Sequence, residues 1–300
     1  MEHIFAINVR FRFCFSLKVM AKNAARKIEE LFVLKRERGI KVSAIVPVYC
    51  EEKTVGGVLE SILNHPLIDE VVCVDDASED KSLEILKSFD SKIKLVVHKR
   101  NRGKGAALTS GIKEAKGDVV CFFDADLLNL SSYHIAKLLE PILRGEARSV
   151  VGYPKLQFQG FKSWSGERAY WRVDLLPFLK EMSSSRFGVE IYLNERFKNK
   201  VKFVNLIGLE GYYKFEKFDF DKAMSEYIKL VSEVTRIKMK MLGVGIKESR
   251  EILRLFRSKG VDDFRRKAML IKNDKIRSFL TKNVLRYLSF LENRWRSLSN

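Results

Sequence analysis

Two aspartates with one small residue between them stand at the end of a short apolar run. Asp124 and Asp126 follow Val119–Phe123 and flank Ala125. In extended backbone, residues i and i+2 point to the same side, so both carboxylates can face one ion. Mg²⁺ and Mn²⁺ prefer such hard oxygen ligands, and Mg²⁺ usually binds through one or two carboxylates together with substrate phosphates. The pair predicts a divalent-metal site, with an ordinary acidic loop as the alternative.

A second acidic pair, Asp75 and Asp76, follows the apolar run Val71–Val74. Asp80 is better placed to cap the helix expected after this pair, because Asp75 and Asp76 come too early in the chain for that role. Two adjacent charges at the end of a strand favour hydrogen bonding to a bound ligand. A nucleobase N–H or a ribose hydroxyl would suit such carboxylates as a donor.

A basic segment that contains two glycines separates the acidic pairs. Residues 98–108 read HKRNRGKGAAL. The glycines allow the backbone to approach a ligand closely, and the helix that starts here offers free N–H groups to an anion. The P-loop pattern GxxxxGK[ST] is absent. An anion site and a basic surface turn before a helix are both compatible with this segment.

The elements that must position these residues alternate between strands and helices. Strands are predicted at Val42–Val48, Val71–Val74, Ile93–Val97 and Val119–Phe123, and helices at about 54–64, 81–89, 104–115 and 131–143. Such alternation is typical of an α/β domain with a parallel sheet. Ligands bind beyond the carboxyl ends of parallel strands, so both acidic pairs are expected at one edge of the sheet.

The pattern changes after Gly145. Further strands are predicted at 149–153 and 201–206, helices at 166–180 and 188–197, and a basic helical region from about residue 220. We predict three parts: an N-terminal extension (1–40), an α/β catalytic domain (41–215) and a basic helical C-terminal extension (216–300). The start of the chain mixes Arg and Lys into an apolar stretch and makes a poor signal peptide. This stretch is either an added N-terminal strand or helix, or a product of an upstream start codon with true initiation of translation near Met20.

The net charge of the chain indicates which kinds of molecule it could bind. A formal net charge of +18 and an isoelectric point near 9.7 favour nucleic acid, an anionic lipid surface or phosphorylated small molecules. No apolar run approaches the roughly 20 residues of a membrane-spanning helix. The cysteines are Cys14, Cys50, Cys73 and Cys121. They form no CxxC pair, which favours reduced thiols in a cytoplasmic protein over a disulfide framework or a zinc site.

Four segments in a fixed order carry a resemblance to a known family. They are VSAIVPVYCEE at 42–52, VVCVDDASED at 71–80, NRGKGAALTSGIKEAKGD at 101–118 and VVCFFDADL at 119–127. Together they resemble the family-2 glycosyltransferases of the GT-A fold, in particular the polyprenyl-phosphate (dolichyl-phosphate) sugar transferases and related phospho-acceptor enzymes. Segments at 165–179 and 187–197 extend the resemblance. It implies a Rossmann-like, mostly parallel central sheet flanked by helices, with a helical C-terminal extension.

This resemblance implies a site for a nucleotide sugar and a divalent metal. The residues that would contact the base, the ribose and the diphosphate are Pro47, Tyr49, Glu51, Val74, Asp76, Lys104, Asp124 and Ala125. Asp124 and Asp126 would hold Mg²⁺ or Mn²⁺. Asp126 would act in catalysis together with Arg168 and Glu190, which fall where these enzymes shape the acceptor site.

The chain departs from the family pattern at two positions. Leu128 stands where dolichyl-phosphate-type enzymes often have a glutamine. Gly211 stands where many relatives have a histidine that serves as a further metal ligand. The third protein ligand is therefore open, with Glu210 or a water molecule as the substitutes.

The resemblance implies the transfer of a sugar from a UDP- or GDP-sugar to a phosphorylated acceptor. A polyprenyl or dolichyl phosphate is the first choice of acceptor, and a soluble acceptor such as phosphoglycerate is the second. A phosphate acceptor needs no strong base, whereas a hydroxyl acceptor would need Glu190 as one. A nucleotide-sugar-binding protein without catalysis is one alternative. A nucleic-acid-binding protein is another, which the acidic pairs disfavour because they would repel phosphates.

The last predicted helix has two interpretations. Leu280, Val284, Leu288, Leu291, Trp295 and Leu298 form an apolar stripe along residues 279–298. A basic amphipathic helix with a tryptophan can lie on an anionic membrane surface, here the inner face of the cell membrane. The same spacing suits packing on the catalytic core or on a dimer partner, and this second interpretation is favoured.

Overall fold

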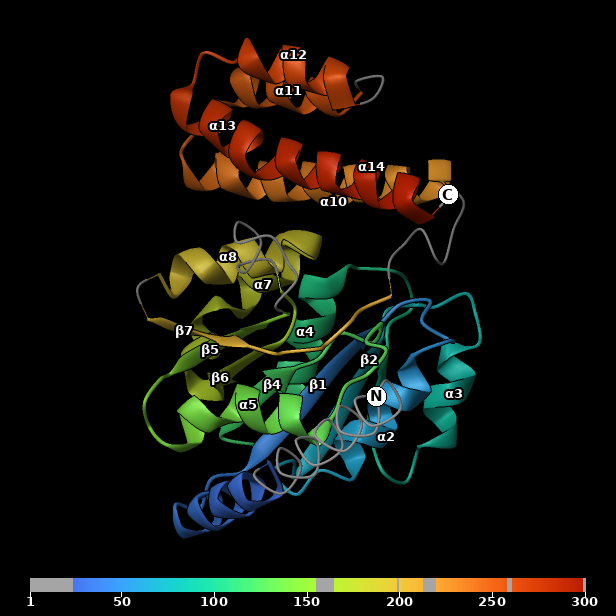
Figure 1. The fold of residues 1–300 in the computed structure, drawn as a ribbon, viewed down its shortest axis with the longest axis vertical. Coiled ribbons are helices and arrows are strands. Elements are labelled where there is room, and N and C mark those ends of the chain that lie inside the picture. Colours follow the sequence, from blue (N-terminus) through green and yellow to red (C-terminus); the bar gives the residue numbers. More distant parts are fainter. Residues whose placement is uncertain (1–23, 155–164, 199, 213–219, 258–260, 299–300) are drawn as a thin grey trace, which may run out of the picture.

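The structure is a computed structural model that describes residues 24–154, 165–198, 200–212, 220–257 and 261–298 (Figure 1). The predictions for the start of the chain, including Met20 and Cys14, lie outside these residues, as does the predicted boundary near residue 215. Residues 24–37 are helical. This first helix packs on the sheet through Leu31, which is fully buried.

The centre of the molecule is one sheet of seven strands in the order β3-β2-β1-β4-β6-β5-β7. The strands are β1 (Val42–Val48), β2 (Glu70–Asp75), β3 (Lys94–Val97), β4 (Val119–Phe122), β5 (Ser149–Tyr153), β6 (Arg168–Trp171) and β7 (Val201–Asn205). Strands β1 to β4 pair in parallel, as do β5 and β7. Strand β6 runs antiparallel to its neighbours β4 and β5. The predicted α/β fold with a mostly parallel sheet is confirmed.

The prediction of a continuous helix over 166–180 is wrong at its start. Arg168–Trp171 forms strand β6, and helix α6 (Arg172–Leu175), the 3₁₀ turn η2 (Leu176–Phe178) and helix α7 (Leu179–Ser184) follow it. The strand forms because β4 and β5 offer hydrogen-bonding edges on both of its sides. Such pairing with distant strands overrides the local helical spacing.

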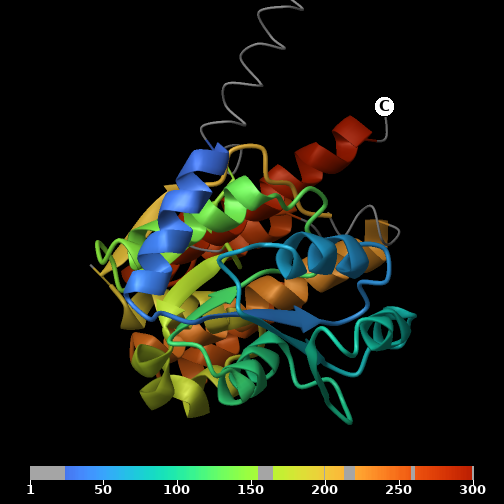
Figure 2. The same cartoon turned by 90° about the horizontal axis from the view of Figure 1, so that it is seen from below.

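Helices cover both faces of the sheet (Figures 1 and 2). They include α2 (Val55–Leu63), α3 (Ser82–Ser88), α4 (Lys104–Glu114), α5 (Ser132–Leu143) and α8 (Val189–Arg196). One apolar cluster joins α2, α3, α5 and the first helix to one face, and a second joins α4, α7 and α8 to the other. Successive residues of β1 point to opposite faces of the sheet. Ala44 and Val46 therefore belong to the first apolar cluster, and Ile45 belongs to the second.

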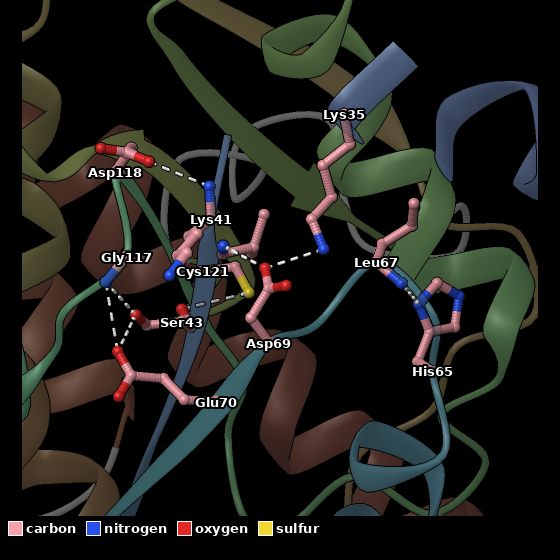
Figure 3. A network of polar contacts seen from close by, with 11 residues as sticks. Lys35, Lys41, Ser43, His65, Leu67, Asp69, Glu70, Gly117, Asp118 and Cys121 are labelled. Carbon is pink, nitrogen blue, oxygen red and sulfur yellow. Dashed lines mark hydrogen bonds and ion pairs between the residues drawn. The ribbon is translucent and has the colours of Figure 1, made fainter. Parts of the chain in front are cut away.

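Polar contacts join the strands at the amino end of the sheet, opposite the acidic pairs (Figure 3). Asp69 Oδ2 accepts a hydrogen bond from Val42 N at 2.7 Å and lies 2.7 Å from Lys35 Nζ. Nearby, Ser43 Oγ donates to Glu70 Oε1 at 2.5 Å and accepts from Gly117 N at 2.8 Å. The contacts fix β1 to β2 and to the turn before β4, so they set the register in which the strands reach the opposite edge.

Asp69→Ala is expected to lower the free energy of unfolding by about 2 kcal/mol, because the Lys35 ammonium is 4% exposed and would lose its carboxylate. The effect is smaller than for a fully buried pair, since Asp69 is 38% exposed. Urea unfolding measures the change. Asp118→Ala is the control, because the contact that its carboxylate makes among the described residues is an exposed hydrogen bond from Lys41 N. Equal destabilisation by both variants would contradict the prediction.

A helical bundle follows the sheet domain. Its helices are α10 (Phe220–Met241), α11 (Ile246–Arg254), α12 (Val261–Met269), α13 (Asp274–Phe279), the π-helical segment η5 (Leu280–Leu285) and α14 (Arg286–Leu298). In Figure 1 the bundle lies above α7 and α8, and α10 is its nearest helix to the sheet domain. Lys238 of α10 forms an ion pair with Glu195 of α8.

The apolar stripe of the last helix packs inside this bundle. Leu280, Val284 and Leu288 are buried in the main apolar cluster of the bundle, and Leu291 is buried in a neighbouring one. The stripe is therefore used for packing, but within the C-terminal bundle and not on the catalytic core as expected. Among the described helices, none combines the length and the apolar character that a bilayer crossing requires.

Candidate active site

The paired aspartates lie just beyond β4, at the carboxyl edge of the sheet. Phe123 N donates to Ile45 O at 3.2 Å, so the chain follows β1 up to the acidic motif. Asp124 and Asp126 are half-buried, whereas Ala125 between them is buried. Both carboxylates thus stand at the end of a strand that is itself buried along its length.

A later segment of the chain lies against the acidic motif. Leu127 and Gly211 form an antiparallel bridge, and the Asp126 carbonyl accepts a hydrogen bond from Tyr212 N at 2.7 Å. A Cβ atom added to Gly211 would find Asp126 as its nearest neighbour, with the carbonyl oxygen at 3.9 Å and Oδ1 at 4.0 Å. Position 211 therefore faces the Asp126 side of the motif but supplies no ligand. Leu128 is 49% exposed and adds no polar group.

Gly211→His is expected to tighten Mn²⁺ binding, because the new side chain has room beside Asp126 and adds an imidazole ligand. The gain should be about tenfold or more, since even outer-shell partners of metal ligands change affinity by that factor. Titration calorimetry with Mn²⁺ and UDP measures the change. The control is Gly211→Ala, which adds a Cβ atom at the same position but no imidazole. Gly208→His is unsuitable as a control because Gly208 has a φ of +82°, which would strain any side chain. Equal Mn²⁺ affinity of the His and Ala variants would refute the prediction.

Lys104 joins the acidic motif to a helix on the other side of the site. It is the first residue of α4, and its Nζ atom lies 2.6 Å from Asp124 Oδ1 and 2.7 Å from Glu190 Oε1. Burial alone would lower the pKa of Lys104, but the two carboxylates outweigh it and raise the pKa above its usual value. The ammonium therefore stays charged, and it holds three chain segments together.

The segment before β6 closes over Asp124. A Cβ atom added to Gly166 would lie 2.2 Å from Asp124 Oδ2, so only glycine leaves room for this carboxylate. Next to it, Glu167 is 5% exposed and accepts a hydrogen bond from Ser165 Oγ at 2.5 Å. Burial and the charge of Asp124 raise the pKa of Glu167 to about 7. The sequence prediction missed Glu167, although it lies in the same SGERA segment that supplied Arg168.

Arg168 lies in β6 and is 1% exposed. Its Nε donates to the Ser165 carbonyl at 2.8 Å, and its Nη1 donates to Asn194 Oδ1 at 2.9 Å and to Tyr170 Oη at 3.1 Å. These bonds anchor the segment that carries Gly166, and they link it to α8. The described contacts of Arg168 therefore position the acidic cluster.

The nucleotide-side candidates lie at the ends of β1 and β2. Pro47 and Val74 are direct partners in the parallel register of these strands. Beyond β1, Tyr49 is 41% exposed and Glu51 is half-buried. The turn between them is fixed by Ser78 Oγ, which accepts a hydrogen bond from the backbone N of Cys50 at 3.0 Å. The four predicted residues are thus brought to one edge of the sheet.

Asp76 is 3% exposed and binds the glycine-containing loop. Its Oδ2 accepts a hydrogen bond from Gly103 N at 2.6 Å, and its Oδ1 accepts one from Arg102 N at 2.9 Å. Oδ1 also lies 2.6 Å from His98 Nδ1. The same carboxylate that was predicted to contact the base or ribose therefore fixes the start of α4, where Lys104 begins.

Asp75 has a buried oxygen that lacks a hydrogen-bond donor. Its Oδ2 accepts from Ser78 N at 3.2 Å, whereas Oδ1 has no partner in the part of the chain that the structure describes. A buried carboxylate oxygen without a donor is costly. A ligand N–H or O–H at this edge would satisfy it.

The acidic motif fits a divalent metal that shares its ligands with a diphosphate. Asp124 and Glu190 contact the Lys104 ammonium, and Glu167 lies near Asp124, so carboxyl groups outnumber the ammonium in this cluster and favour further positive charge. Within the described ranges, no group of three or more His, Cys, Asp or Glu side chains has the arrangement of a complete metal site. Two carboxylates suit Mg²⁺ or Mn²⁺ that completes its shell with phosphate oxygens and water.

Known proteins share this sequence pattern. A family model described as Glycosyl transferase family 2 matches residues 43–212, which is more than half of the 300-residue chain. The match begins in β1 and ends at Tyr212, beside the acidic motif. It therefore includes every candidate residue from Pro47 to Glu190.

Two curated relatives act on different acceptors. The UDP-N-acetylglucosamine–dolichyl-phosphate N-acetylglucosaminyltransferase of Methanococcus voltae is 31% identical over 36% of this chain and 49% of its own length. The glucosyl-3-phosphoglycerate synthase of Petrotoga mobilis is 29% identical over 43% of this chain and 42% of its own length. The chain thus spans less than half the length of these relatives.

A solved structure shares the fold. The glucosyl-3-phosphoglycerate synthase of Mycobacterium tuberculosis, in complex with Mn²⁺, UDP and phosphoglyceric acid, superposes with a TM-score of 0.56 and 23% identity. The superposition covers 69% of this chain and 81% of the other. This likeness, together with the sheet order and the flanking helices, identifies the GT-A fold. The extent of the family match shows that the chain belongs to glycosyltransferase family 2.

Proposed function

We propose that the protein is a metal-dependent glycosyltransferase that moves a sugar from a UDP- or GDP-sugar to a phosphorylated acceptor. The observation that carries this proposal is the ion pair of Lys104 with both Asp124, the first residue of the acidic pair, and Glu190 at the carboxyl edge of the sheet. Family membership supports the same chemistry.

In this proposal the nucleotide occupies the edge formed by β1 and β2. Pro47, Tyr49 and Glu51 border the base, and the orphan oxygen of Asp75 accepts a hydrogen bond from it. Val74 is fully buried and acts as the strand partner that supports Pro47. Asp76 contributes to donor binding in two ways: by its predicted contact with the base or ribose, and by fixing the loop at Gly103, where α4 starts. The donor therefore lies between the end of β1 and the start of α4.

The diphosphate lies at the acidic motif. Asp124 and Asp126 would hold Mg²⁺ or Mn²⁺, which as a Lewis acid stabilises the negative charge that develops on the leaving diphosphate. Ala125 leaves room beside these ligands. Lys104 is ion-paired with Asp124 and would supply positive charge to a phosphate oxygen. Its double contact with Asp124 and Glu190 keeps it in place before the donor arrives.

The acceptor is proposed to be a phosphate, with a polyprenyl or dolichyl phosphate as the first choice. An anionic phosphate is already a nucleophile, so positioning matters more than a strong base. Arg168 acts on this side by holding the Gly166 segment and α8 in place. Glu190 is the base if the acceptor is a hydroxyl.

The second choice, a soluble phosphoglycerate, is supported by the name of the Petrotoga relative. We place the reaction in the cytoplasm, at the inner face of the membrane if the acceptor is a lipid.

A thermal-shift screen of UDP- and GDP-sugars with and without Mn²⁺ tests the donor site. A donor at a hundred times its Kd should stabilise the folded state by about 2.7 kcal/mol. Transfer assays with a short polyprenyl phosphate and with 3-phosphoglycerate then separate the two acceptors. No stabilisation by any nucleotide sugar would refute the proposal. Binding without metal-dependent sugar release would favour the non-catalytic alternative.

A further inference from the structure

Three large apolar side chains project into solvent at one end of the C-terminal bundle. Ile246 is 75% exposed, Met269 is 60% exposed and Leu270 is 80% exposed. Ile246 begins α11, whereas Met269 ends α12 and Leu270 follows it. In Figure 1 the connections α10–α11 and α12–α13 lie at the same, left-hand end of the bundle. Scattered exposed apolar residues are ordinary, but a group at one tip marks an interaction site.

Ordered loops hold these side chains outward. Val244 and Ile271, which lie close to them in the two connections, pack against the apolar core of the bundle. Asn273 caps α13, because its Oδ1 accepts a hydrogen bond from Ile276 N at 3.2 Å. The inner residues of both connections, Val244 and Ile271, are therefore half-buried, and the outer ones are exposed.

Lysines surround the apolar tip. Lys240, Lys247, Lys272 and Lys275 are exposed, and no acidic partner is recorded for them among the described residues. Other cations of the same helices are paired, for example Arg277 with Asp274. Residues 240–248 and 270–275 contain these four lysines and two acidic residues, Glu248 and Asp274, of which Asp274 is paired with Arg277. The tip thus combines apolar side chains with net positive charge.

We propose that this surface docks on an anionic lipid bilayer. Ile246, Met269 and Leu270 would enter the interfacial region, and the four lysines would lie among the lipid phosphates. The lysine stems can cover apolar surface while their ammonium groups stay in the polar layer. A second copy of the chain fits less well, because a two-fold contact at this tip would bring the lysines of both copies together. We name it the lipid-docking tip.

The lipid-docking tip differs from the surface that an amphipathic last helix would offer. The stripe through Leu280, Val284 and Leu288 is buried in the bundle and unavailable to lipid. The inference also goes beyond sugar transfer, because docking needs neither the donor nor the acceptor. A failure of vesicle binding would leave the proposed catalytic function untouched, and the reverse also holds.

Flotation of the full chain with vesicles tests the proposal. We expect binding to phosphatidylcholine vesicles that contain phosphatidylglycerol, weak binding to phosphatidylcholine alone, and release at high salt. K247E/K272E should weaken binding to the anionic vesicles about tenfold or more, given the contribution of each lysine near such a surface. I246S/M269S/L270S should weaken it similarly without lowering the melting temperature, because all three side chains are exposed.

Two matched variants on the sheet domain serve as controls. V173S/L176S removes apolar side chains that are 60% and 41% exposed, and K87E/K92E reverses two exposed lysines. Both should bind vesicles like the unaltered chain. The proposal is overturned if the unaltered chain ignores anionic vesicles, or if the tip variants bind as well as the controls. It is also overturned if light scattering shows a dimer that I246S/M269S/L270S dissociates while vesicle binding is unchanged.

Discussion

Asp126→Asn is expected to lower kcat/KM for sugar transfer by about 10²–10³-fold, the range seen when a group that stabilises transition-state charge is removed. The neutral amide is a weaker ligand for Mg²⁺ or Mn²⁺, so the charge on the leaving diphosphate loses its partner. The fold should persist, because the substitution keeps the backbone carbonyl of Asp126, which accepts a hydrogen bond from Tyr212 N. Steady-state kinetics over a range of Mn²⁺ concentrations measures the loss.

Asp118→Asn is the matched control for this experiment. Asp118 lies at the other end of β4, where its Oδ2 accepts a hydrogen bond from Lys41 N at 2.9 Å. An asparagine there can keep that bond through its amide oxygen, so activity should stay unchanged. Near-normal activity of Asp126→Asn at low Mn²⁺ would contradict the metal assignment.

Gly166→Ala is expected to remove most of the activity, by about 10²-fold or more, because misplacing a catalytic group by about 1 Å can cost that factor. The added Cβ would lie 2.2 Å from Asp124 Oδ2 and 2.5 Å from its Cγ, so the carboxylate must turn away. The contact between Asp124 and Lys104 would be lost with it. Transfer assays and Mn²⁺ titrations should both report the change.

Gly57→Ala separates this effect from a general cost of replacing glycine. Gly57 lies within α2, and a Cβ atom there would meet nothing within 4 Å. The alanine should leave activity unchanged and raise stability slightly, as expected for a helix interior. Full activity of Gly166→Ala with unchanged Mn²⁺ affinity would show that the observed position of Asp124 is not the active one.

Local patterns in the sequence predict the strand–helix alternation and the place of the acidic motif. The run Val119–Phe122 is apolar throughout and Val42–Val48 is apolar except for Ser43, as is typical of strands buried on both faces. Because parallel strands end at one edge, Asp75, Asp76, Asp124 and Asp126 could be assigned to a common edge without coordinates.

Strand β6 and the partners of the charged residues could not be predicted in this way. Arg168–Trp171 is too short for a clear alternation, and it becomes a strand only between β4 and β5. Lys104, Asp124 and Glu190 come from three distant segments, so their ion pairs follow from packing. The burial that raises the pKa of Glu167 is likewise a property of the folded chain.

The bridge between Leu127 and Gly211 also limits how far the bundle can move from the reaction centre. Tyr212 is bonded to the Asp126 carbonyl, and helix α10 begins at Phe220. The eight peptide units between these residues can span at most about 28 Å. The loop that carries Asp126 and the first turn of α10 therefore stay within this distance of each other. A bilayer that holds the bundle would keep the reaction centre within a few nanometres of its own surface.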